Sequence, residues 1–338
     1  ILFYGTKTQK YVDYHQYICD LTAVRISNLA RIIKERTENR AIVISFYGYQ
    51  FELYSSLSGH HNLNWLLSDK NIDGFAGPIS YRDRNGSSYA PNSPVGATGA
   101  YMSTVDSIQR NGKIWFQESD ERTFINHTDE PYEDTFLTPI RSLSDVIEVH
   151  KRELGDTIIH GNGLWAMDLW ARGWLDDPAI WENLGKLSNL YQAYQNGYGQ
   201  ASRFDVALVV DEYSLHRMAN QGPVGDELLG EMQLNLYHAG LSTCYVQLKD
   251  VLAGRVDDAK LYIITSAFDM TDEQIEQLQT ALHKDGKTTL FMYNFGSMTT
   301  QQTKALTGME FKVKRLQSRT GITMTKQSAV PGLISDNH

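Results

Sequence analysis

A short apolar segment that ends in a group of carboxylates is the first feature of this sequence that could do chemistry. The segment 112–117 has strand-like apolar and aromatic residues, and Glu118, Asp120 and Arg122 follow it. Strands of (β/α) barrels present catalytic groups at their carboxyl ends, where the loops begin. Glu118 is therefore a candidate catalytic carboxylate. The alternative is that 118–123 is a charged, solvated turn in which Glu118 pairs with Arg122.

The order of residues in this strand predicts the direction in which Glu118 points. Side chains alternate between the two faces of a strand, so Ile114, Phe116 and Glu118 share one face. If that face lines a barrel interior, Glu118 emerges above the core, where the reacting atoms lie. Arg122 would then keep the carboxylate ionised by charge pairing, as a nucleophile requires.

A second carboxylate, Asp168, lies in a tryptophan-rich segment with Trp165, Trp170 and Trp174. An indole ring stacks on the apolar face of a sugar, and carboxylates accept hydrogen bonds from the sugar hydroxyls. This grouping is therefore typical of a carbohydrate site. The alternative is that these tryptophans are ordinary core residues.

A long polar loop, 80–100, follows the second apolar strand and contains Tyr81 and Arg82. Loops of this length are usually functional or disordered. We expect Tyr81 and Arg82 to contact the edge of a substrate, with surface decoration as the alternative. Tyr47, at the end of the first strand, is a further candidate for substrate binding.

Composition and charge limit the class of protein. The chain has 338 residues, of which 41% are hydrophobic and 11% aromatic, enough to bury a large core and to form two domains. The net charge is −9 and no cluster of Lys and Arg offsets it, so we expect no nucleic-acid partner. No apolar run approaches the roughly 18 residues that span a membrane. A neutral substrate fits this composition best.

Neither a metal nor a cofactor is expected. His60 and His61 have no carboxylate or cysteine at ligand spacing, so we expect solvated loop histidines. Cys19 and Cys244 lie far apart and are predicted to be buried free thiols. The chain begins at Ile1 with no targeting segment, and we expect it to be a piece of something longer. Its location, periplasmic or secreted against cytoplasmic, stays open.

Alternating strands and helices must position these residues. Residues 1–198 contain four apolar strand segments, at 40–49, 72–78, 113–117 and 163–170, separated by helical segments at 63–68, 103–111 and 138–154 and flanked by others at 11–37 and 178–194. This alternation predicts a parallel sheet, and four such units look like the C-terminal half of a (β/α)8 TIM barrel. Half a barrel leaves an open edge and an unfilled interior. We therefore expect the other four strands upstream of Ile1.

Residues 203–308, after a Gly-rich linker at 196–202, predict a doubly wound, flavodoxin-like α/β domain. Thr271 is expected to cap a helix that ends near Lys284. The first strand of this domain is followed by Asp211 and Glu212 instead of a Gly-rich phosphate loop, so we expect a packing or oligomerisation role. Residues 309–338 are expected to begin a further β-rich segment.

Four motifs resemble the C-terminal half of the catalytic barrel in glycoside hydrolase family 42 and its relatives, which include β-galactosidases and the similar β-mannosidases of family 164. The motifs are Phe46-Tyr47-Gly48-Tyr49 and the segments 77–84, 113–123 and 165–174. The segment 204–308 resembles the trimerisation domain that follows the barrel in those enzymes. The resemblance covers nearly the whole chain.

The resemblance implies a retaining exo-β-glycosidase that hydrolyses terminal β-linked hexosides by double displacement. Glu118 matches the family's nucleophile after barrel strand seven, and no residue here matches its acid/base, which would lie outside this chain. The resemblance also implies a homotrimer and no cofactor. Galactose and mannose both remain possible sugars. The alternatives are an endo-acting glycanase on a galactan or mannan, and a catalytically inactive carbohydrate-binding barrel.

Within that enzyme each candidate side chain has an expected task. The aromatic walls around the sugar would be formed by Tyr81, Trp165 and Trp170. The sugar hydroxyls would be fixed by Arg82, Asp120 and Asp168. Tyr47 would add a further contact to the substrate.

Overall fold

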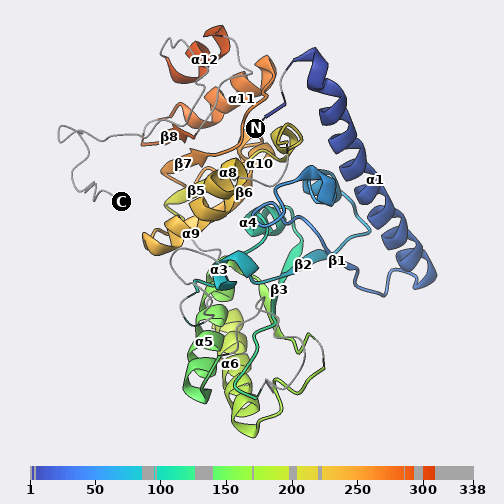
Figure 1. The fold of residues 1–338 in the computed structure, drawn as a ribbon, viewed down its shortest axis with the longest axis vertical. Helices are drawn as coiled ribbons and strands as arrows, with labels where there is room; N and C mark the ends of the chain where they lie inside the picture. Colours follow the sequence, from blue (N-terminus) through green and yellow to red (C-terminus); the bar gives the residue numbers. More distant parts are fainter. Residues whose placement is uncertain are drawn as a thin grey trace, which may run out of the picture.

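The chain is an α/β protein with two four-stranded parallel sheets (Figure 1). The computed structural model describes residues 2–3, 5–85, 95, 97–125, 140–169, 171–197, 204–219, 223–284, 286–292 and 300–308. The α/β class predicted from strand–helix alternation is confirmed. Among the described residues, no helix is both long and apolar enough to cross a membrane.

The first sheet has its strands in the order in which they occur along the chain, all parallel. They are β1 (Ile44–Phe46), β2 (Gly74–Pro78), β3 (Ile114–Ser119) and β4 (Gly163–Ala166). The helical elements around them are α1 (Thr6–Arg36), η1 (Ser56–Ser58), α2 (Leu63–Leu66), α3 (Tyr81–Asn85), α4 (Val105–Arg110), α5 (Leu143–His160) and α6 (Pro178–Gly197). β1 is shorter than the strand predicted over 40–49, because the chain turns at Gly48, whose φ is 88°.

One face of this sheet is apolar and open. The register aligns Ile44 with Ile114 through β2, and Phe46 with Phe116, so these side chains leave the same face. Phe46 is 53% exposed and Ile114 is 43% exposed. Glu118 and Trp165 are aligned further along the same face.

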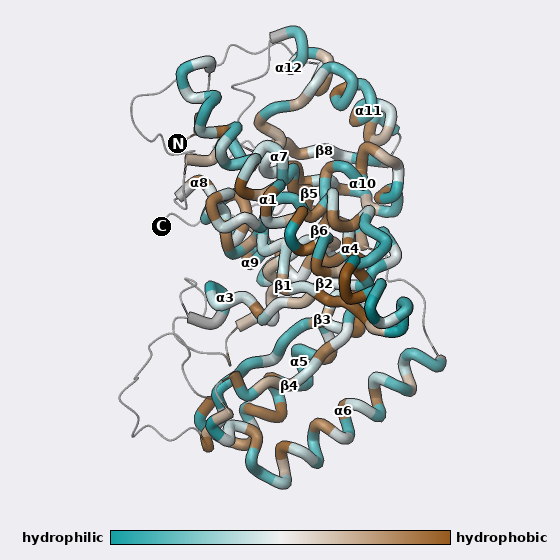
Figure 2. Tube along the Cα trace, turned by 90° about the vertical axis from the view of Figure 1, so that its right-hand side faces the viewer, coloured by the Kyte–Doolittle hydropathy of each residue, from teal (hydrophilic) through white to brown (hydrophobic). Residues whose placement is uncertain are grey.

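The opposite face of the first sheet is buried in the largest core. Phe75 and Trp115 point into it and pack with apolar residues of α1, α2 and α4. Val206 and Leu208 of the second sheet belong to the same core. Figure 2 shows apolar residues gathered around α4, β2 and β6, where the two sheets approach each other.

The second sheet has the strand order β6-β5-β7-β8 and is also parallel. Its strands are β5 (Val206–Val210), β6 (Thr243–Gln247), β7 (Leu261–Ile264) and β8 (Thr288–Phe291). Its helices are α7 (Glu212–Leu215), α8 (Pro223–Gly225), the π-helical η3 (Asp226–Gly230), α9 (Glu231–His238), α10 (Leu248–Leu252), α11 (Asp272–Leu282) and α12 (Thr300–Thr307). Thr271 begins α11 with a reciprocal capping box to Gln274, and this confirms the predicted cap.

Polar contacts join the two sheets through short helices. The edge strand β6 donates its Tyr245 N–H to Asp106 of α4 at 2.7 Å and its Gln247 N–H to the Ser107 hydroxyl at 2.7 Å. α4 thus covers backbone groups that an edge strand would otherwise leave open. The predicted packing role of the second unit agrees with these contacts.

Several predictions fall partly or wholly outside the described residues. These are most of the linker at 196–202, the further segment at 309–338 and much of the loop at 80–100. Cys19 and Cys244 are both described, and each is a buried free thiol as predicted.

Candidate functional site

The carboxyl end of β3 is buried. Glu118 is 4% exposed, and every residue from Ser119 to Thr123 is buried as well. The alternative of a solvated, charged turn is therefore wrong. Residues that follow β1, β2 and β4, among them Tyr49, Ile79 and Trp174, contact this end of β3. The local sequence pattern of 118–123 does not reveal these contacts, so it could not predict the burial.

Glu118 is the charged residue of β3, and its side chain leaves the open face of the sheet near the carboxyl end of the strand. Its register neighbours are Pro78 of β2 and Trp165 of β4. Its backbone carbonyl accepts a hydrogen bond from the Ile79 N–H at 3.1 Å, which fixes the position of β3 against the loop after β2.

A tyrosine lies beside the carboxylates of Glu118 and Asp120. Burial, with the negative charges of Glu118 and Asp120, raises the pKa of Tyr49. The phenol therefore stays protonated, and its hydroxyl donates to the Ala76 carbonyl at 3.1 Å. Tyr49 follows β1, so three successive strands contribute to this cluster.

Tyr81 and Asp120, both predicted to contact the substrate, are hydrogen-bonded to each other. The Tyr81 hydroxyl donates to Asp120 Oδ2 at 2.9 Å. The start of α3 is held by Glu52, which accepts from the Ser80 hydroxyl at 2.7 Å and from the Arg82 N–H at 3.2 Å. Glu52 thus positions Tyr81, and with it the hydrogen bond to Asp120.

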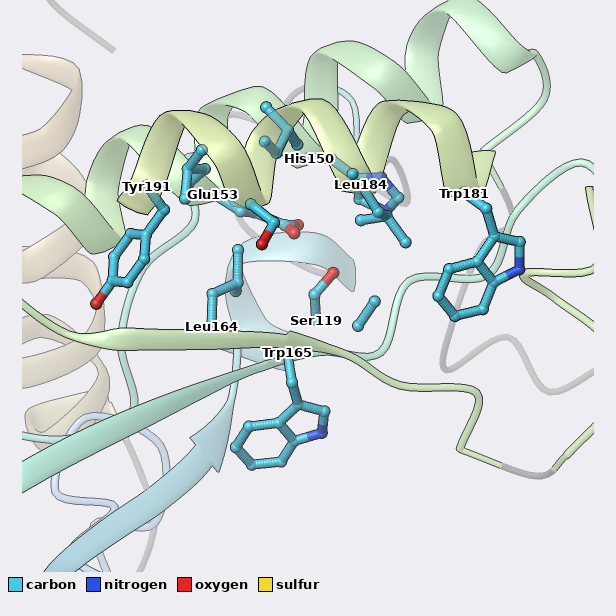
Figure 3. A pocket seen from close by; sticks show the side chains of 13 residues that line it. Ser119, His150, Glu153, Leu164, Trp165, Trp181, Leu184 and Tyr191 are labelled. Atoms are coloured by element: carbon cyan, nitrogen blue, oxygen red, sulfur yellow. The ribbon is translucent and has the colours of Figure 1, made fainter. Parts of the chain in front are cut away.

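Trp165 lies on the open face, in an aromatic group. Its ring is 6.1 Å from that of Phe46 and 5.9 Å from that of Phe116, measured between centroids. Figure 3 shows the indole on the side of β4 away from Glu153 and Ser119. Trp165 therefore offers an aromatic surface beside Glu118.

The loops after β3 and β4 are tied together. The Arg122 guanidinium lies 5.5 Å from the centre of the Trp174 ring, within the range of a cation–π contact. The Thr123 hydroxyl donates to the Trp174 carbonyl. Trp174 is fully buried, so it is a core residue, which was one of the two readings of the tryptophan-rich segment.

Asp168 is not placed to fix a sugar hydroxyl. Its carboxylate accepts backbone N–H groups from Arg172 at 2.9 Å, Gly173 at 2.6 Å and Trp174 at 3.2 Å. These bonds close a turn in which Ala171 and Gly173 have positive φ. Asp is a common residue at such turns because its side chain mimics a backbone acceptor. The prediction for Asp168 is corrected on this ground.

Two other predicted contacts serve the fold. Arg82 pairs with Asp226 of η3 at 2.7 Å and lies over the Tyr54 ring, so its guanidinium connects the two sheets. Tyr47 is fully buried, and its hydroxyl donates to the Gly59 carbonyl at 2.8 Å and accepts from the Asn62 N–H at 3.0 Å. Both predictions of substrate contact are corrected. Trp170, the remaining predicted contact, lies outside the described residues.

The two adjacent histidines are not solvated, contrary to expectation. The His60 ring stacks between Tyr47 and Tyr49, at 5.1 and 4.6 Å between centroids. Burial lowers the pKa of His60 to about 4, so the ring is neutral at neutral pH. His61 is buried beside His216, and burial lowers its pKa to about 3. The sequence feature that could have indicated this stacking is the pair of aromatic residues Tyr47 and Tyr49, which flank Gly48 shortly before His60.

The arrangement at the carboxyl end of β3 combines two carboxylates, two phenols and a half-buried indole. These are Glu118, Asp120, Tyr49, Tyr81 and Trp165. Such a set can hold a polyhydroxylated ring against an aromatic surface and present a carboxylate to one of its carbons. Within the described residues, no group of three or more His, Cys, Asp or Glu side chains is arranged to hold a metal ion.

No protein-family model matches this sequence, and no curated protein matches it significantly.

Proposed function

We propose that this chain is the C-terminal half of the catalytic barrel of a retaining β-glycosidase, of the kind found in glycoside hydrolase family 42 and its relatives. Glu118 is the nucleophile. One observation carries the proposal: Glu118 is buried at the carboxyl end of a parallel strand, on the same face as the half-buried indole of Trp165. Carboxylate and aromatic surface thus lie side by side, as a glycoside requires.

The first sheet supports the half-barrel part of the proposal. Four parallel strands in sequential order, with helices on one face, are the repeating pattern of a (β/α)8 barrel. The open face has Ile44, Phe46 and Ile114, which would fill the interior of a closed barrel. The remaining four strands would pair with the free edges of β1 and β4.

The second sheet supports a flavodoxin-like unit, because its strands have the 2-1-3-4 order of that fold. By resemblance to the trimerisation domain of the family, the whole protein is proposed to be a homotrimer. Sedimentation equilibrium on the protein that contains both barrel halves tests this directly, and a monomeric mass would contradict it.

The proposed reaction has two displacements. A Glu118 carboxylate oxygen attacks the anomeric carbon while the bond from that carbon to the leaving oxygen breaks, and the leaving oxygen takes a proton from a glutamate outside this chain. That glutamate then removes a proton from water, whose oxygen attacks the same carbon and releases Glu118. A retaining reaction needs the two carboxyl groups about 5–5.5 Å apart.

The residues around Glu118 have distinct tasks in this reaction. Trp165 stacks on the apolar face of the sugar. Asp120, oriented by the Tyr81 hydroxyl at 2.9 Å, accepts a hydrogen bond from a sugar hydroxyl. Tyr49, whose pKa is raised by burial and by the two carboxylates, remains a neutral neighbour of Glu118.

The test is Glu118→Gly in the protein that contains both barrel halves, assayed with aryl β-galactosides and aryl β-mannosides. We expect turnover to fall by about 10⁴-fold or more, as for other enzymes that lose a covalent nucleophile. Azide should restore activity and form the α-glycosyl azide, because it attacks from the face that Glu118 occupied. The better aryl glycoside identifies the sugar.

Glu121→Gly is the matched control, since Glu121 is a buried carboxylate three residues away. It should give no azide rescue and no glycosyl azide, even if activity falls. Near-normal turnover by Glu118→Gly sinks the nucleophile assignment. A wild-type protein that binds galactose or mannose without hydrolysing either aryl glycoside supports the carbohydrate-binding alternative instead.

A further inference from the structure

A second, separate pocket lies under helices α5 and α6, on the face of the first sheet opposite Glu118 (Figure 3). Its volume is about 450 Å³, within the range of small-molecule sites. Figure 3 shows Ser119 and Glu153 entering it while the Trp165 ring lies beyond β4. Trp165 is also among the residues that line the pocket, but its ring lies beyond β4, so the cavity and the cluster around Glu118 are on opposite faces of the sheet.

Two buried polar side chains in the lining of this pocket are unsatisfied. Ser119 and His150 are each 3% exposed and line it. Within the described part of the chain, Ser119 Oγ and His150 Nδ1 have no hydrogen-bond partner. Buried polar atoms are normally paired, and two unpaired ones in the lining of one cavity point to a missing partner.

The charge around these polar residues disfavours an anionic ligand. Burial lowers the pKa of His150 to about 4, so the imidazole is neutral at neutral pH. The carboxylate of Glu153 also lines the pocket and lies 3.5 Å from the Arg152 guanidinium. A ligand head there meets a hydroxyl, a neutral imidazole and a carboxylate that already has a cation beside it.

Most of the remaining lining is apolar, with Ser188 and Tyr191 of α6 as the other polar residues. Leu154, Leu164 and Leu184 form walls, and Trp181, 60% exposed, lies at the margin. Gly185 lines the pocket from the middle of α6, and a Cβ added there would meet no atom within 4 Å. Gly185 is itself exposed, so an alanine Cβ there meets open space, and only a longer side chain is expected to reach into the pocket.

We propose that this pocket binds a small uncharged alcohol: an apolar body between the leucines, with its hydroxyl bonded to Ser119, His150 and Glu153. A hydroxyl can donate to a carboxylate and also accept from a serine or an imidazole N–H. The site stands independently of the proposed glycosidase activity, because it lies on the other face of the sheet.

The probe is 2-phenylethanol, with phenylacetate and ethylbenzene as matched compounds that keep the body and change or remove the head. Binding to the protein that contains both barrel halves is measured by ligand-observed NMR titration. We expect 2-phenylethanol to bind at least tenfold more tightly than phenylacetate and severalfold more tightly than ethylbenzene. Equal affinity for alcohol and carboxylate, or no binding of the alcohol, overturns the proposal.

Two variants at one position locate the site. Gly185→Leu should reduce the affinity for 2-phenylethanol at least tenfold by filling the pocket, whereas Gly185→Ala should change it by less than threefold. His150→Leu should weaken the alcohol and leave ethylbenzene unchanged. Binding that survives Gly185→Leu in a chain with unaltered circular dichroism places the ligand elsewhere and overturns the assignment.

Discussion

Glu118 and Trp165 are register partners across β3 and β4, and their side chains leave the same face of the sheet. Neighbouring strands are about 4.8 Å apart, so a ring stacked on the indole would be within reach of the carboxylate. The two strands are separated by more than forty residues of sequence. The pairing of β3 with β4, and no local sequence pattern, brings Glu118 and Trp165 together.

Trp165→Ala in the protein with both barrel halves should lower kcat/KM for the preferred aryl glycoside by about tenfold or more, because the stacking surface is lost. Trp181→Ala is the control, since Trp181 lies on α6, on the other side of β4. It should leave kcat/KM within about twofold. Equal losses in the two variants would contradict a role for Trp165 in substrate binding.

Tyr81→Phe removes one hydroxyl and its 2.9 Å hydrogen bond to Asp120. We expect kcat/KM to fall about tenfold, because Asp120 loses the group that orients it, while the free energy of unfolding falls by about 1 kcal/mol. Kinetics and urea unfolding measure the two effects. Tyr213→Phe, at an exposed tyrosine, should alter neither. A Tyr81→Phe enzyme with unchanged kcat/KM removes Asp120 and Tyr81 from the site.

The strand segments follow from the sequence because parallel strands are mostly continuous apolar runs, although β1, which such a run predicts to be buried, has Ile44 and Phe46 exposed. The same periodicity assigned Ile114, Phe116 and Glu118 to one face, and the register agrees. The sequence and the family resemblance assigned Tyr81 and Asp120 to the same substrate site, and the two side chains are hydrogen-bonded to each other. These parts of the fold and site depend on local pattern.

The corrected residues depend on partners that local pattern does not reveal. Arg82 pairs with Asp226, 144 positions away, across the two sheets. Asp168 was predicted to bind a sugar hydroxyl, but its carboxylate accepts backbone N–H groups of the positive-φ turn that follows it in the chain. His60 and His61 were expected to be solvated because no carboxylate or cysteine stands at ligand spacing, but that criterion carries no information about burial: His60 stacks on Tyr47 and Tyr49, and His61 lies beside His216.

Phe46→Ser should reduce self-association of the 338-residue chain, because Phe46 is exposed on the open apolar face. Analytical ultracentrifugation over a range of concentrations measures the effect. Leu241→Ser, at an exposed leucine of the second unit, is the control and should change association little. In the protein with both barrel halves Phe46 would lie inside the closed barrel, so Phe46→Ser should lower the free energy of unfolding more than Leu241→Ser does. Equal losses of stability in the two variants argue against a closed barrel.

Glu212 should make the protein less stable as the pH rises. Burial raises its pKa from 4.5 to about 7, although its carboxylate accepts the Asn64 N–H at 2.7 Å and the Leu63 N–H at 2.8 Å. Between these two pKa values the folded chain binds more protons than the unfolded chain. The free energy of unfolding therefore decreases from pH 4.5 to above 7, by about 3 kcal/mol for this group.

Glu212→Gln should flatten that slope, since a neutral side chain does not titrate. The measurement is urea unfolding at pH 5.5 and pH 7.5. The quantity compared is the difference between the two pH values, which a general loss of stability does not affect. An equal pH dependence in Glu212→Gln and the wild type contradicts the assignment.

The buried histidines His61 and His216 should make the protein less stable as the pH falls, the opposite of the effect of Glu212. Burial lowers the pKa of His61 to about 3 and of His216 to about 4, below the unfolded value of 6.5. Below pH 6.5 the unfolded chain binds more protons, so stability decreases as the pH falls toward 4. His61→Gln should show a smaller decrease between pH 6.5 and 4.5 than the wild type. His238→Gln, at an exposed histidine, should match the wild type.

Gly59→Ala should destabilise the protein by about 1–3 kcal/mol. Gly59 has a φ of 80°, and an added Cβ would lie 2.5 Å from Thr22 Oγ1 of α1. Its carbonyl also accepts a hydrogen bond from the Tyr47 hydroxyl, so a displaced Gly59 disturbs the stack of Tyr47, His60 and Tyr49.

Gly155→Ala is the matched control for Gly59→Ala. Gly155 lies inside α5 with no atom near an added Cβ, and alanine should stabilise that helix by up to about 1 kcal/mol. Opposite signs in urea unfolding are expected, and a neutral Gly59→Ala would show that the loop carrying His60 adjusts without cost.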